Sequence, residues 1–592
     1  MLFEEVARYY EKLEGISSRL EMVDVLTEML GKAKAVEIKQ LIYFTQGMLA
    51  PPFEGIEAGI ADKLAEEAIA IATGYSKDDV SASFRKTGDL GITAEEFAKG
   101  SKLKRMSAGK YDVKAVFETM LQIANTSGEG SKAAKIKALA NIIASSSPLE
   151  AKYLVRFSLG ELRLGVGDAT ILEALSKLVA GNRTLKEKLE NAYNICSDLG
   201  AVGEVLMSGG VKAIEGFKVS LFKPIRPALA ERLPTSQEIL ERMHGRCAVE
   251  SKYDGLRAQV HVDKKARRVE IFSRRLERLT GMFPELVAAA LKETKAERLI
   301  IEGEAISYDE TTGQFRPFQE TIQRKRKHEV KEKSEELPLH LFAFDLMYIN
   351  GVDYLGKPYS ERRKKLEETV SGTGTIRLAD RIIASSAKEI DQYFEDVVSN
   401  GLEGIVAKDL GAKYIAGARK FSWIKMKRSY KGELTDTVDL AIVGYYVGKG
   451  SRTAFGLGGL LGAVYNDKED VFETITKIGT GFTEQMMQEL KKTLDKIKTA
   501  KKPARVKALI EPDFWVEPKY VITVKADEIT KSPMHTAGRH EESGIDTGYA
   551  LRFPRIVGGG IRADKSAEEA TTTKEIIEMF NQQRKTRLSE AP

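Results

Sequence analysis

Residues 223–227, with the sequence Lys-Pro-Ile-Arg-Pro, hold two prolines and divide the chain into parts of different character. Proline fixes its own φ angle and disfavours helix for the preceding residue, so this segment favours extended backbone. Before it, apolar residues recur at helical spacing, as in residues 113–125, whereas β-rich runs such as residues 298–308 follow it. A chain of 592 residues is also too long for one core, so we expect several domains.

Three segments follow from these patterns. Residues 1–222 predict an all-α domain whose helices are separated by glycine-rich breaks. Residues 223–430 mix strands and helices and predict an α+β domain. Residues 431–592 return to short strands whose lengths suit a small β-barrel, followed by a helical tail from 574 to 587.

The composition excludes several kinds of site. Two cysteines cannot form a disulfide framework or a zinc knuckle, but magnesium stays open because it needs only carboxylates and phosphates. The sequence has no run of about 18 apolar residues, and its acidic, amphipathic N-terminus does not resemble a signal peptide. We therefore expect a cytoplasmic protein without a membrane span. The net charge of +6 indicates a polyanionic partner only if the basic residues cluster.

The run Lys252-Tyr253-Asp254-Gly255 begins an ordered series of polar motifs. Alone it is weak, because most lysines are solvated and such a string can be a simple strand-end turn. The later motifs are Ser273-Arg274-Arg275, Glu302-Gly303-Glu304, Phe344-Asp345, Glu403-Gly404-Ile405-Val406-Ala407-Lys408 and Trp423-Ile424-Lys425-Met426-Lys427. We place each at the end of an apolar, strand-like run, from which side chains can converge on one pocket. Each alone has roughly one chance in ten of being functional, but an ordered set is far less easily produced by accident.

These residue types suit attack on a nucleotide phosphate. A lysine amine becomes nucleophilic when burial or a neighbouring cation favours its neutral form, and Lys425 and Lys427 are such neighbours if they lie beside Lys252. Charge would then grow on the phosphoryl oxygens and on the departing pyrophosphate, where cations stabilise it. The candidates are Arg257, Arg274, Arg419, Lys425 and Lys427 for the phosphates, Glu304 and Glu403 for magnesium, and Phe344 for stacking on the base.

The ordered set KYDGLR, SRR, EGE, FDLMYING, EGIVAK and WIKMK resembles the covalent nucleotidyltransferase superfamily of DNA ligases, RNA ligases and mRNA capping enzymes. Longer stretches, such as VESKYDGLRAQVH and FDLMYINGVDYLGKPYSERR, are similar to ATP-dependent DNA ligases of the archaeal and eukaryotic replicative type, and the resemblance covers nearly the whole chain. It implies a helical DNA-binding domain over 1–222, an ATP-grasp-like nucleotidyltransferase (adenylation) domain over 223–430, and an OB-fold domain over 431–592.

The resemblance also implies roles for matching residues. Lys252 would form the AMP-lysine, and Glu250 would recognise the adenine amino group. The remaining implied contacts are Arg257 and Arg274 with nucleotide or 5′-phosphate, Glu304 with the ribose side and metal, Phe344 with adenine, Glu403 with metal, and Arg419 and Lys425 with the phosphates, with Lys427 close by. The implied cofactors are ATP and Mg²⁺. The implied substrate is nicked double-stranded DNA, sealed by a monomer in replication, repair and recombination.

The C-terminal region departs from the family pattern. Relatives usually follow a Phe-Pro-Arg run with closely spaced arginines and then Asp-Lys. Here residues 556–561, which include three glycines, separate Arg555 from Arg562. We take Arg562 as the first candidate for contact with pyrophosphate and Arg555 as the second.

Two glycine-rich loops before helices are candidate DNA contacts, because the free amides and the dipole of a helix N-terminus attract anions. These loops contain Lys132, Arg163 and Gly165, which could follow a DNA backbone without reading bases. Each loop alone is more typical of a connection between bundle helices, and the resemblance favours DNA contact. A sliding clamp is a further candidate partner, but residues 99–106 lack the Gln and paired aromatics of a clamp motif and are better interpreted as a basic loop.

Two alternatives remain from sequence. An RNA ligase or capping enzyme would carry the same motifs and differ in its substrate and nucleotide. A non-catalytic clamp that binds DNA breaks would lack the lysine or the carboxylates, and both are intact here. A nicotinamide-dependent ligase is disfavoured, because such enzymes carry a cysteine zinc site.

Overall fold

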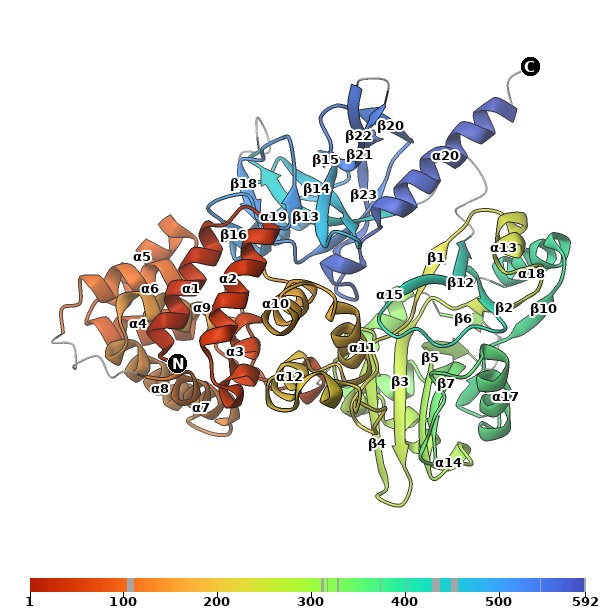
Figure 1. Ribbon diagram of the computed structural model, residues 1–592, viewed down its shortest axis with the longest axis horizontal. Coiled ribbons are helices and arrows are strands. Elements are labelled where there is room, and N and C mark those ends of the chain that lie inside the picture. Colours follow the sequence, from red (N-terminus) through yellow and green to blue (C-terminus); the bar gives the residue numbers. More distant parts are fainter. Residues whose placement is uncertain are drawn as a thin grey trace.

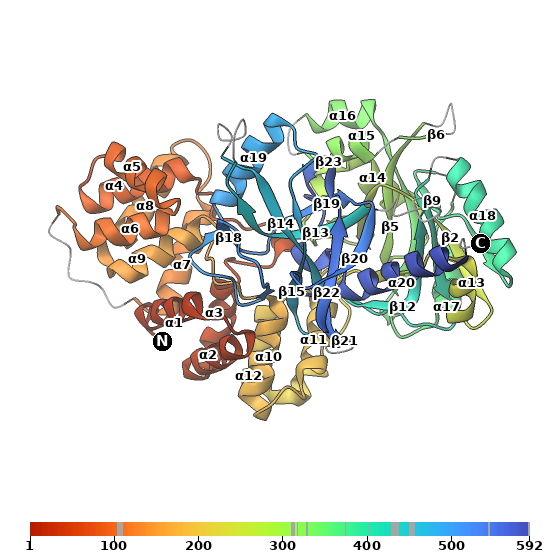
Figure 2. The same ribbon diagram turned by 90° about the horizontal axis from the view of Figure 1, so that it is seen from above.

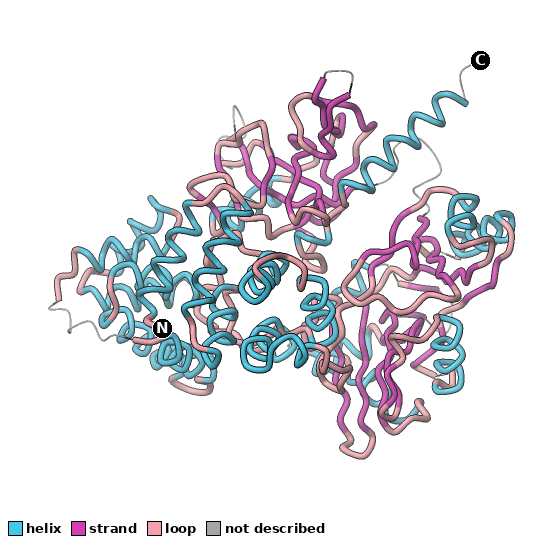
Figure 3. Tube along the Cα trace, viewed as in Figure 1, coloured by secondary structure: helices cyan, strands magenta, loops and turns pink. Residues whose placement is uncertain are grey.

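The computed structural model describes the chain except for residues 104–110, 310–313, 317, 327–328, 373, 401, 428–436, 449–455, 543–544 and 590–592. It contains a helical part at the N-terminus, a central part built on two sheets, and a strand-rich C-terminal part that lies over the junction of the other two (Figure 1). Colouring by secondary structure separates the helical part clearly from the two strand-rich parts (Figure 3).

The N-terminal part is helical, as predicted, and its buried side chains form one core. Its helices are α1 (Phe3–Gly15), α2 (Arg19–Lys32), α3 (Ile38–Thr45), α4 (Asp62–Thr73), α5 (Lys77–Thr87), α6 (Leu90–Lys99), α7 (Val113–Asn125), α8 (Ser131–Ser145), α9 (Pro148–Ser158), α10 (Asp168–Ala180), α11 (Lys186–Cys196) and α12 (Leu199–Ile214). In α1, Phe3, Tyr10 and Leu13 are buried on one face because helical spacing aligns them. At the centre of the core, the ring of Phe44 lies 4.6 Å from that of Phe157.

The central part contains two neighbouring sheets. Its elements are β1 (Leu229–Arg232), α13 (Ser236–Arg242), β2 (Cys247–Lys252), β3 (Leu256–Asp263), β4 (Arg268–Ser273), α14 (Pro284–Glu293), β5 (Arg298–Asp309), β6 (Gln314–Phe315), α15 (Phe318–Thr321), α16 (Val330–Glu336), β7 (Leu339–Ile349), β8 (Val352–Asp353), α17 (Tyr359–Thr369), β9 (Ile376–Leu378), β10 (Arg381–Ala384), α18 (Ala387–Ser399), β11 (Gly404–Asp409) and β12 (Arg419–Lys427). One sheet has the order β1-β12-β11-β2-β10 and the other β4-β3-β5-β7-β8, with β6 paired to β5 and β9 to β7.

Strand register brings the polar motifs together. Gly404 of β11 lies opposite both Lys252 of β2 and Lys427 of β12, so three distant segments meet at one point. In the other sheet, Arg257 of β3 lies opposite Glu304 of β5. One expectation was wrong: Glu304 and Phe344 lie inside their strands and not at strand ends. The apolar runs stop there because these positions face a cavity, while the β-pairing of β5 and β7 continues past them.

The C-terminal part is a second strand-rich unit. Its elements are β13 (Thr437–Tyr446), β14 (Gly459–Asn466), β15 (Val471–Ile478), α19 (Glu484–Asp495), β16 (Lys498–Thr499), β17 (Val506–Lys507), β18 (Phe514–Val516), β19 (Val521–Lys525), β20 (Glu528–Ser532), β21 (Ala537–Glu542), β22 (Ile545–Arg552), β23 (Arg555–Ile561) and the long terminal helix α20 (Thr573–Ser589). The main sheet runs β16-β18-β13-β14-β15-β17, with β19 joining β13 to β23. Within the described residues this sheet does not close into a barrel, so the predicted barrel is not confirmed.

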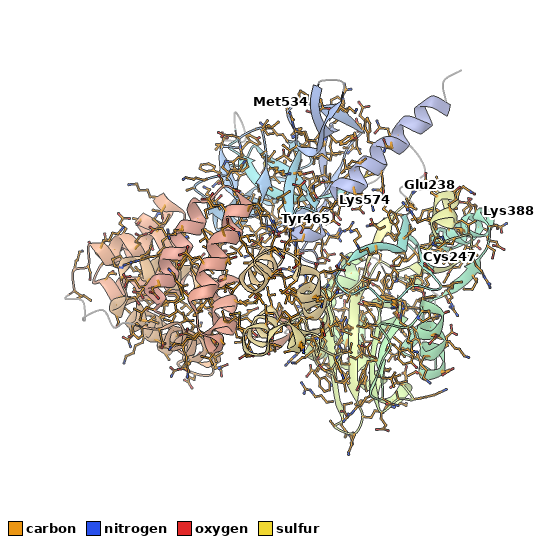
Figure 4. The ribbon with its side chains drawn as sticks, in the orientation of Figure 1. Glu238, Cys247, Lys388, Tyr465, Met534 and Lys574 are labelled. Atoms are coloured by element: carbon orange, nitrogen blue, oxygen red, sulfur yellow. The ribbon has the colours of Figure 1, made fainter. Side chains whose placement is uncertain are left out.

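The C-terminal part contacts both of the others, and the view from above also places it between them (Figure 2). On the helical side, the guanidinium of Arg19 bonds to Asp470 at 3.3 Å. On the central side, α20 leaves the sheet and passes over β1, where the amine of Lys574 donates to Glu231 at 3.2 Å. Lys574, labelled in Figure 4, marks this junction at the start of α20. The three parts are therefore in a closed arrangement.

Candidate active site

A cavity of about 690 Å³ lies between the central part and the C-terminal part. It is lined by every residue that the sequence predicted for nucleotide, metal or catalysis except Arg555, the second choice for contact with pyrophosphate. These residues are Glu250, Lys252, Arg257, Arg274, Glu304, Phe344, Glu403, Arg419, Lys425, Lys427 and Arg562. They come from the strands β2, β3, β5, β7 and β12, from the loops that follow β4 and precede β11, and from the segment after β23. Strand pairing brings the residues of the central part together, and contact of the C-terminal part with the central part adds Arg562.

Lys252 lies at the end of β2 and bonds through its amine to one carboxylate oxygen of Glu403. The amine of Lys427 bonds to the other oxygen. Burial alone would raise the pKa of Glu403, but the charges of the two lysines outweigh it and hold that pKa far below its usual range. Glu403 is therefore ionised, and it keeps two amines side by side at the junction of β2, β11 and β12.

A second carboxylate, Glu304, faces the same space from β5. Burial raises its pKa to about 7, although the positive charges of Lys252 and Arg257 oppose the shift. Glu304 and Glu403 both line this cavity, and their carboxylate oxygens suit magnesium, which binds through one or two carboxylates together with phosphate and water. The residues present therefore fit the predicted ion.

Arg257 occupies the wall beside Glu304, and its partner was not predicted. Its guanidinium bonds to the carboxylate of Glu302 through two contacts of 2.9 Å and donates to the carbonyl of Ala228 at 2.7 Å. Glu302 also accepts from the hydroxyl of Tyr414 at 2.8 Å. Glu302 is thus a buried anchor that fixes Arg257 and not a ligand candidate.

Phe344 and Glu250, the two residues predicted to contact the base, both line the cavity. The ring of Phe344 packs edge-on against Trp423, with centroids 5.8 Å apart. Glu250 is 2% exposed and bonds to the Tyr359 hydroxyl at 2.5 Å and to the Lys408 amine at 2.8 Å. Sequence reasoning missed both partners, although Lys408 stands in the motif EGIVAK and Tyr359 in the stretch GKPYSERR.

The phosphate candidates are paired with carboxylates from the C-terminal part. Arg274 bonds to Glu569 at 2.5 Å, and Glu575 pairs with Arg419 and, at 3.4 Å, with Lys425. Burial lowers the pKa of Lys425 to about 7, although Glu575 opposes the shift. In this arrangement the carboxylates of Glu569 and Glu575 occupy the cations that were predicted to bind the phosphates of a nucleotide.

The two arginine candidates of the C-terminal part differ in position. Arg562 lines the cavity and bonds to Asp564 through contacts of 2.7 and 2.8 Å. Arg555 is exposed and is absent from the cavity lining. The geometry therefore favours Arg562, the first candidate.

The candidate DNA contacts lie in a different place. Arg163 is buried and donates to backbone carbonyls of Lys496 and Lys498, the latter at 3.0 Å, while the amide of Gly165 donates to Glu517 at 3.1 Å. These two residues are therefore covered by the C-terminal part. Lys132 is exposed in the first turn of α8.

Two further expectations concern partners and membranes. Of the segment proposed for a clamp, residues 99–103 are described and residues 104–106 lie outside the described residues. In the described part of the chain, no helix is both long and apolar enough to cross a membrane.

Family models of known proteins match three segments of the chain. Residues 2–176 match the family model described as DNA ligase N terminus, residues 227–427 match ATP dependent DNA ligase domain, and residues 453–565 match ATP dependent DNA ligase C terminal region.

Two of the relatives that match over nearly the full length illustrate the similarity. A protein of Dictyoglomus turgidum described as probable DNA ligase is 48% identical, over 100% of this chain and 99% of its own. A DNA ligase of Saccharolobus solfataricus is 42% identical, over 99% of this chain and 98% of its own. Among solved structures, mycobacterial DNA ligase D complexed with ATP and MES is 23% identical, covers 58% of this chain and 97% of its own, and has a TM-score of 0.33.

Proposed function

The chain belongs to the ATP-dependent DNA ligase family and seals nicks in DNA, and we propose that Lys252 is the nucleophile that carries AMP between ATP and the nick. The observation that carries this proposal is the meeting of Lys252, Glu403 and Lys427 in a cavity lined by cations. RNA ligase, capping and non-catalytic clamp functions are not favoured by the relatives.

The reaction has three steps. First, the amine of Lys252 attacks the α-phosphorus of ATP; a nitrogen–phosphorus bond forms, the bond to pyrophosphate breaks, and pyrophosphate leaves. Second, an oxygen of the 5′-phosphate at the nick attacks the same phosphorus, and Lys252 leaves as the amine. Third, the 3′-hydroxyl attacks the 5′-phosphate and expels AMP.

Several residues of the cavity act in these steps. Arg419 and Lys425 neutralise the phosphates of ATP, Arg562 meets the pyrophosphate, and Phe344 stacks on adenine. Before attack, the amine of Lys252 must leave Glu403 and lose its proton. Glu304 and Glu403 would hold Mg²⁺, which supplies charge neutralisation on the phosphoryl oxygens.

We also propose that the parts rearrange between steps. Residues 1–222 form the DNA-binding domain, 223–430 the adenylation domain and 431–592 an OB-fold domain. The C-terminal part covers Arg163 and Gly165, so it must move aside before DNA reaches them. Contact with a sliding clamp remains a candidate property of the segment around residues 99–106.

Nick sealing with ATP, GTP and NAD supplied separately tests this function. A 5′-labelled nicked duplex and a nicked RNA duplex are the two substrates. We expect sealing of the DNA nick with ATP and Mg²⁺. Efficient sealing with GTP or NAD, or a preference for RNA, would contradict the proposal.

A further inference from the structure

The carboxylate of Glu250 is surrounded by hydrogen-bond donors. Oxygen Oε1 accepts from the hydroxyl of Tyr359 at 2.5 Å and from the guanidinium of Arg363 at 3.4 Å. Oxygen Oε2 lies 2.8 Å from the amine of Lys408. A carboxylate has about four acceptor positions, so these donors leave roughly one for a ligand. Because Glu250 lines the cavity, that last position is available to a bound base.

The amine of Lys408 is paired with the carboxylate of Glu250. The other carboxylate nearby, Asp345, is already held by Arg362 through contacts of 2.7 and 3.0 Å, and it lies 4.0 Å from the Lys408 amine. The amine also donates to the carbonyl of Phe344 at 3.2 Å and lies 4.1 Å from the ring centre of Trp423. Lys408 is 1% exposed, so its amine is fixed by these contacts and not by water.

Alternate side chains of β11 face the cavity and the hydrophobic core, so Lys408 lies on the cavity face and not among the core residues. Along β11, Val406 and Lys408 line the cavity, whereas Ile405 and Ala407 belong to the hydrophobic core on the opposite face, as alternation in a strand requires. Burial lowers the pKa of Lys408, while the carboxylates of Glu250 and Asp345 oppose the shift. A buried lysine costs free energy unless it is paired, and here its partner is the residue that faces the base.

We propose that Lys408, together with Tyr359, fixes the carboxylate of Glu250 with its remaining acceptor position toward the base and so makes the site select purines with a 6-amino group. This inference rests on the proposed function, in which Glu250 faces adenine. Adenine presents a donor at position 6, which suits the last acceptor position. Guanine and hypoxanthine present a carbonyl there, and two acceptors would then face each other without a proton between them.

Lys408 and Tyr359 are positioning residues in this account, because they act through Glu250. Without Lys408, Oε2 loses its charged partner at a position that is 2% exposed to water. The carboxylate would then be free to turn toward other donors, and its preference for a donor on the base would fall. The loss should appear mainly in KM for ATP, because the reacting phosphate and Lys252 are unchanged.

The test measures lysyl-nucleotide formation with ATP and with purine riboside triphosphate, which lacks the 6-amino group. For the unmodified chain, we expect kcat/KM to fall on the order of tenfold to a hundredfold between the two nucleotides. For K408M, we expect this ratio to shrink to about threefold or less, with Y359F between the two. Both nucleotides are measured on one preparation, so any loss of folded protein cancels from the ratio.

Ile405→Val is the matched control, because it trims a buried side chain of the same strand on the opposite face; it should keep the ratio of the unmodified chain. If K408M does not fold, Y359F alone carries the test. An unchanged ratio in K408M, or in Y359F when it stands alone, overturns the inference. Failure of the proposed function looks different, since the unmodified chain would then form no adduct with ATP.

Discussion

Replacing Glu575 with glutamine should tighten ATP binding, because this carboxylate occupies cations that the phosphates need. Glu575 is 3% exposed at the start of α20 and pairs with Arg419 and Lys425. It also accepts from the amide and hydroxyl of Thr572 at 2.8 and 3.1 Å. Burial alone would raise the pKa of Glu575, but the charges of Arg419 and Lys425 hold it well below its usual range. Glu575 is thus an anion at neutral pH and competes with the nucleotide.

The size of the effect follows from these contacts. Removing one partner of a buried ion pair costs about 3–5 kcal/mol. Glutamine keeps the bonds to Thr572 and still offers an oxygen to Arg419. We therefore expect E575Q to destabilise the docked position of α20 by about 1–3 kcal/mol. A ligand that must displace residue 575 gains this difference in binding free energy, which corresponds to about 5- to 150-fold tighter binding when the docked form predominates.

The assay is an equilibrium titration with ATP by calorimetry, in a K252A background that cannot form the adduct. E568Q is the matched control, because Glu568 lies on the same segment but pairs with Arg505 inside the C-terminal part at 3.0 Å. We expect at least about fivefold tighter binding for E575Q and about the parent affinity for E568Q. Equal or weaker binding by E575Q would refute the competition between Glu575 and the nucleotide.

Three further predictions concern stability and DNA. E302A should lower the free energy of unfolding by about 3 kcal/mol in urea, because it leaves buried Arg257 unpaired; a loss below about 1 kcal/mol contradicts this. The pKa of Glu304 is raised from 4.5 to about 7 by burial, so between these pH values the folded state holds a proton that the unfolded state has released. The free energy of unfolding should therefore fall as the pH rises from 4.5 to about 7. E304Q should flatten that slope, and an unchanged slope argues against it. K132E with R163E should weaken nicked-DNA binding and lower its salt slope by about 2, whereas unchanged binding removes these residues from the interface.

The meeting of Lys252 and Glu403 could be predicted from sequence because their motifs lie on or next to strands. Alternation and pairing in a sheet place such residues within reach of one another, and β2, β11 and β12 do so for Lys252, Glu403 and Lys427. The helical spacing of the N-terminal part was equally informative, since amphipathic faces such as that of α1 must be buried.

Other features could not be predicted, because they depend on long-range contacts. Tyr359 lies 109 residues from Glu250, and nothing local in its sequence shows that its hydroxyl donates to that carboxylate. Glu575 looks like an ordinary residue in the first turn of a helix until α20 docks over the cavity. Arg163 is a loop arginine in sequence, and only the docking of the C-terminal part determines that it is buried.

The central claim, that Lys252 carries AMP, is tested most directly by locating the adduct. The protein is incubated with α-labelled ATP and magnesium, digested, and the modified peptide is identified by mass spectrometry. We predict AMP on Lys252, loss of the adduct in K252A, and normal yield in K388A, which changes an exposed lysine of α18 that does not line the cavity (labelled in Figure 4). An adduct of normal yield in K252A, or AMP mapped to Lys425 or Lys427, would contradict it.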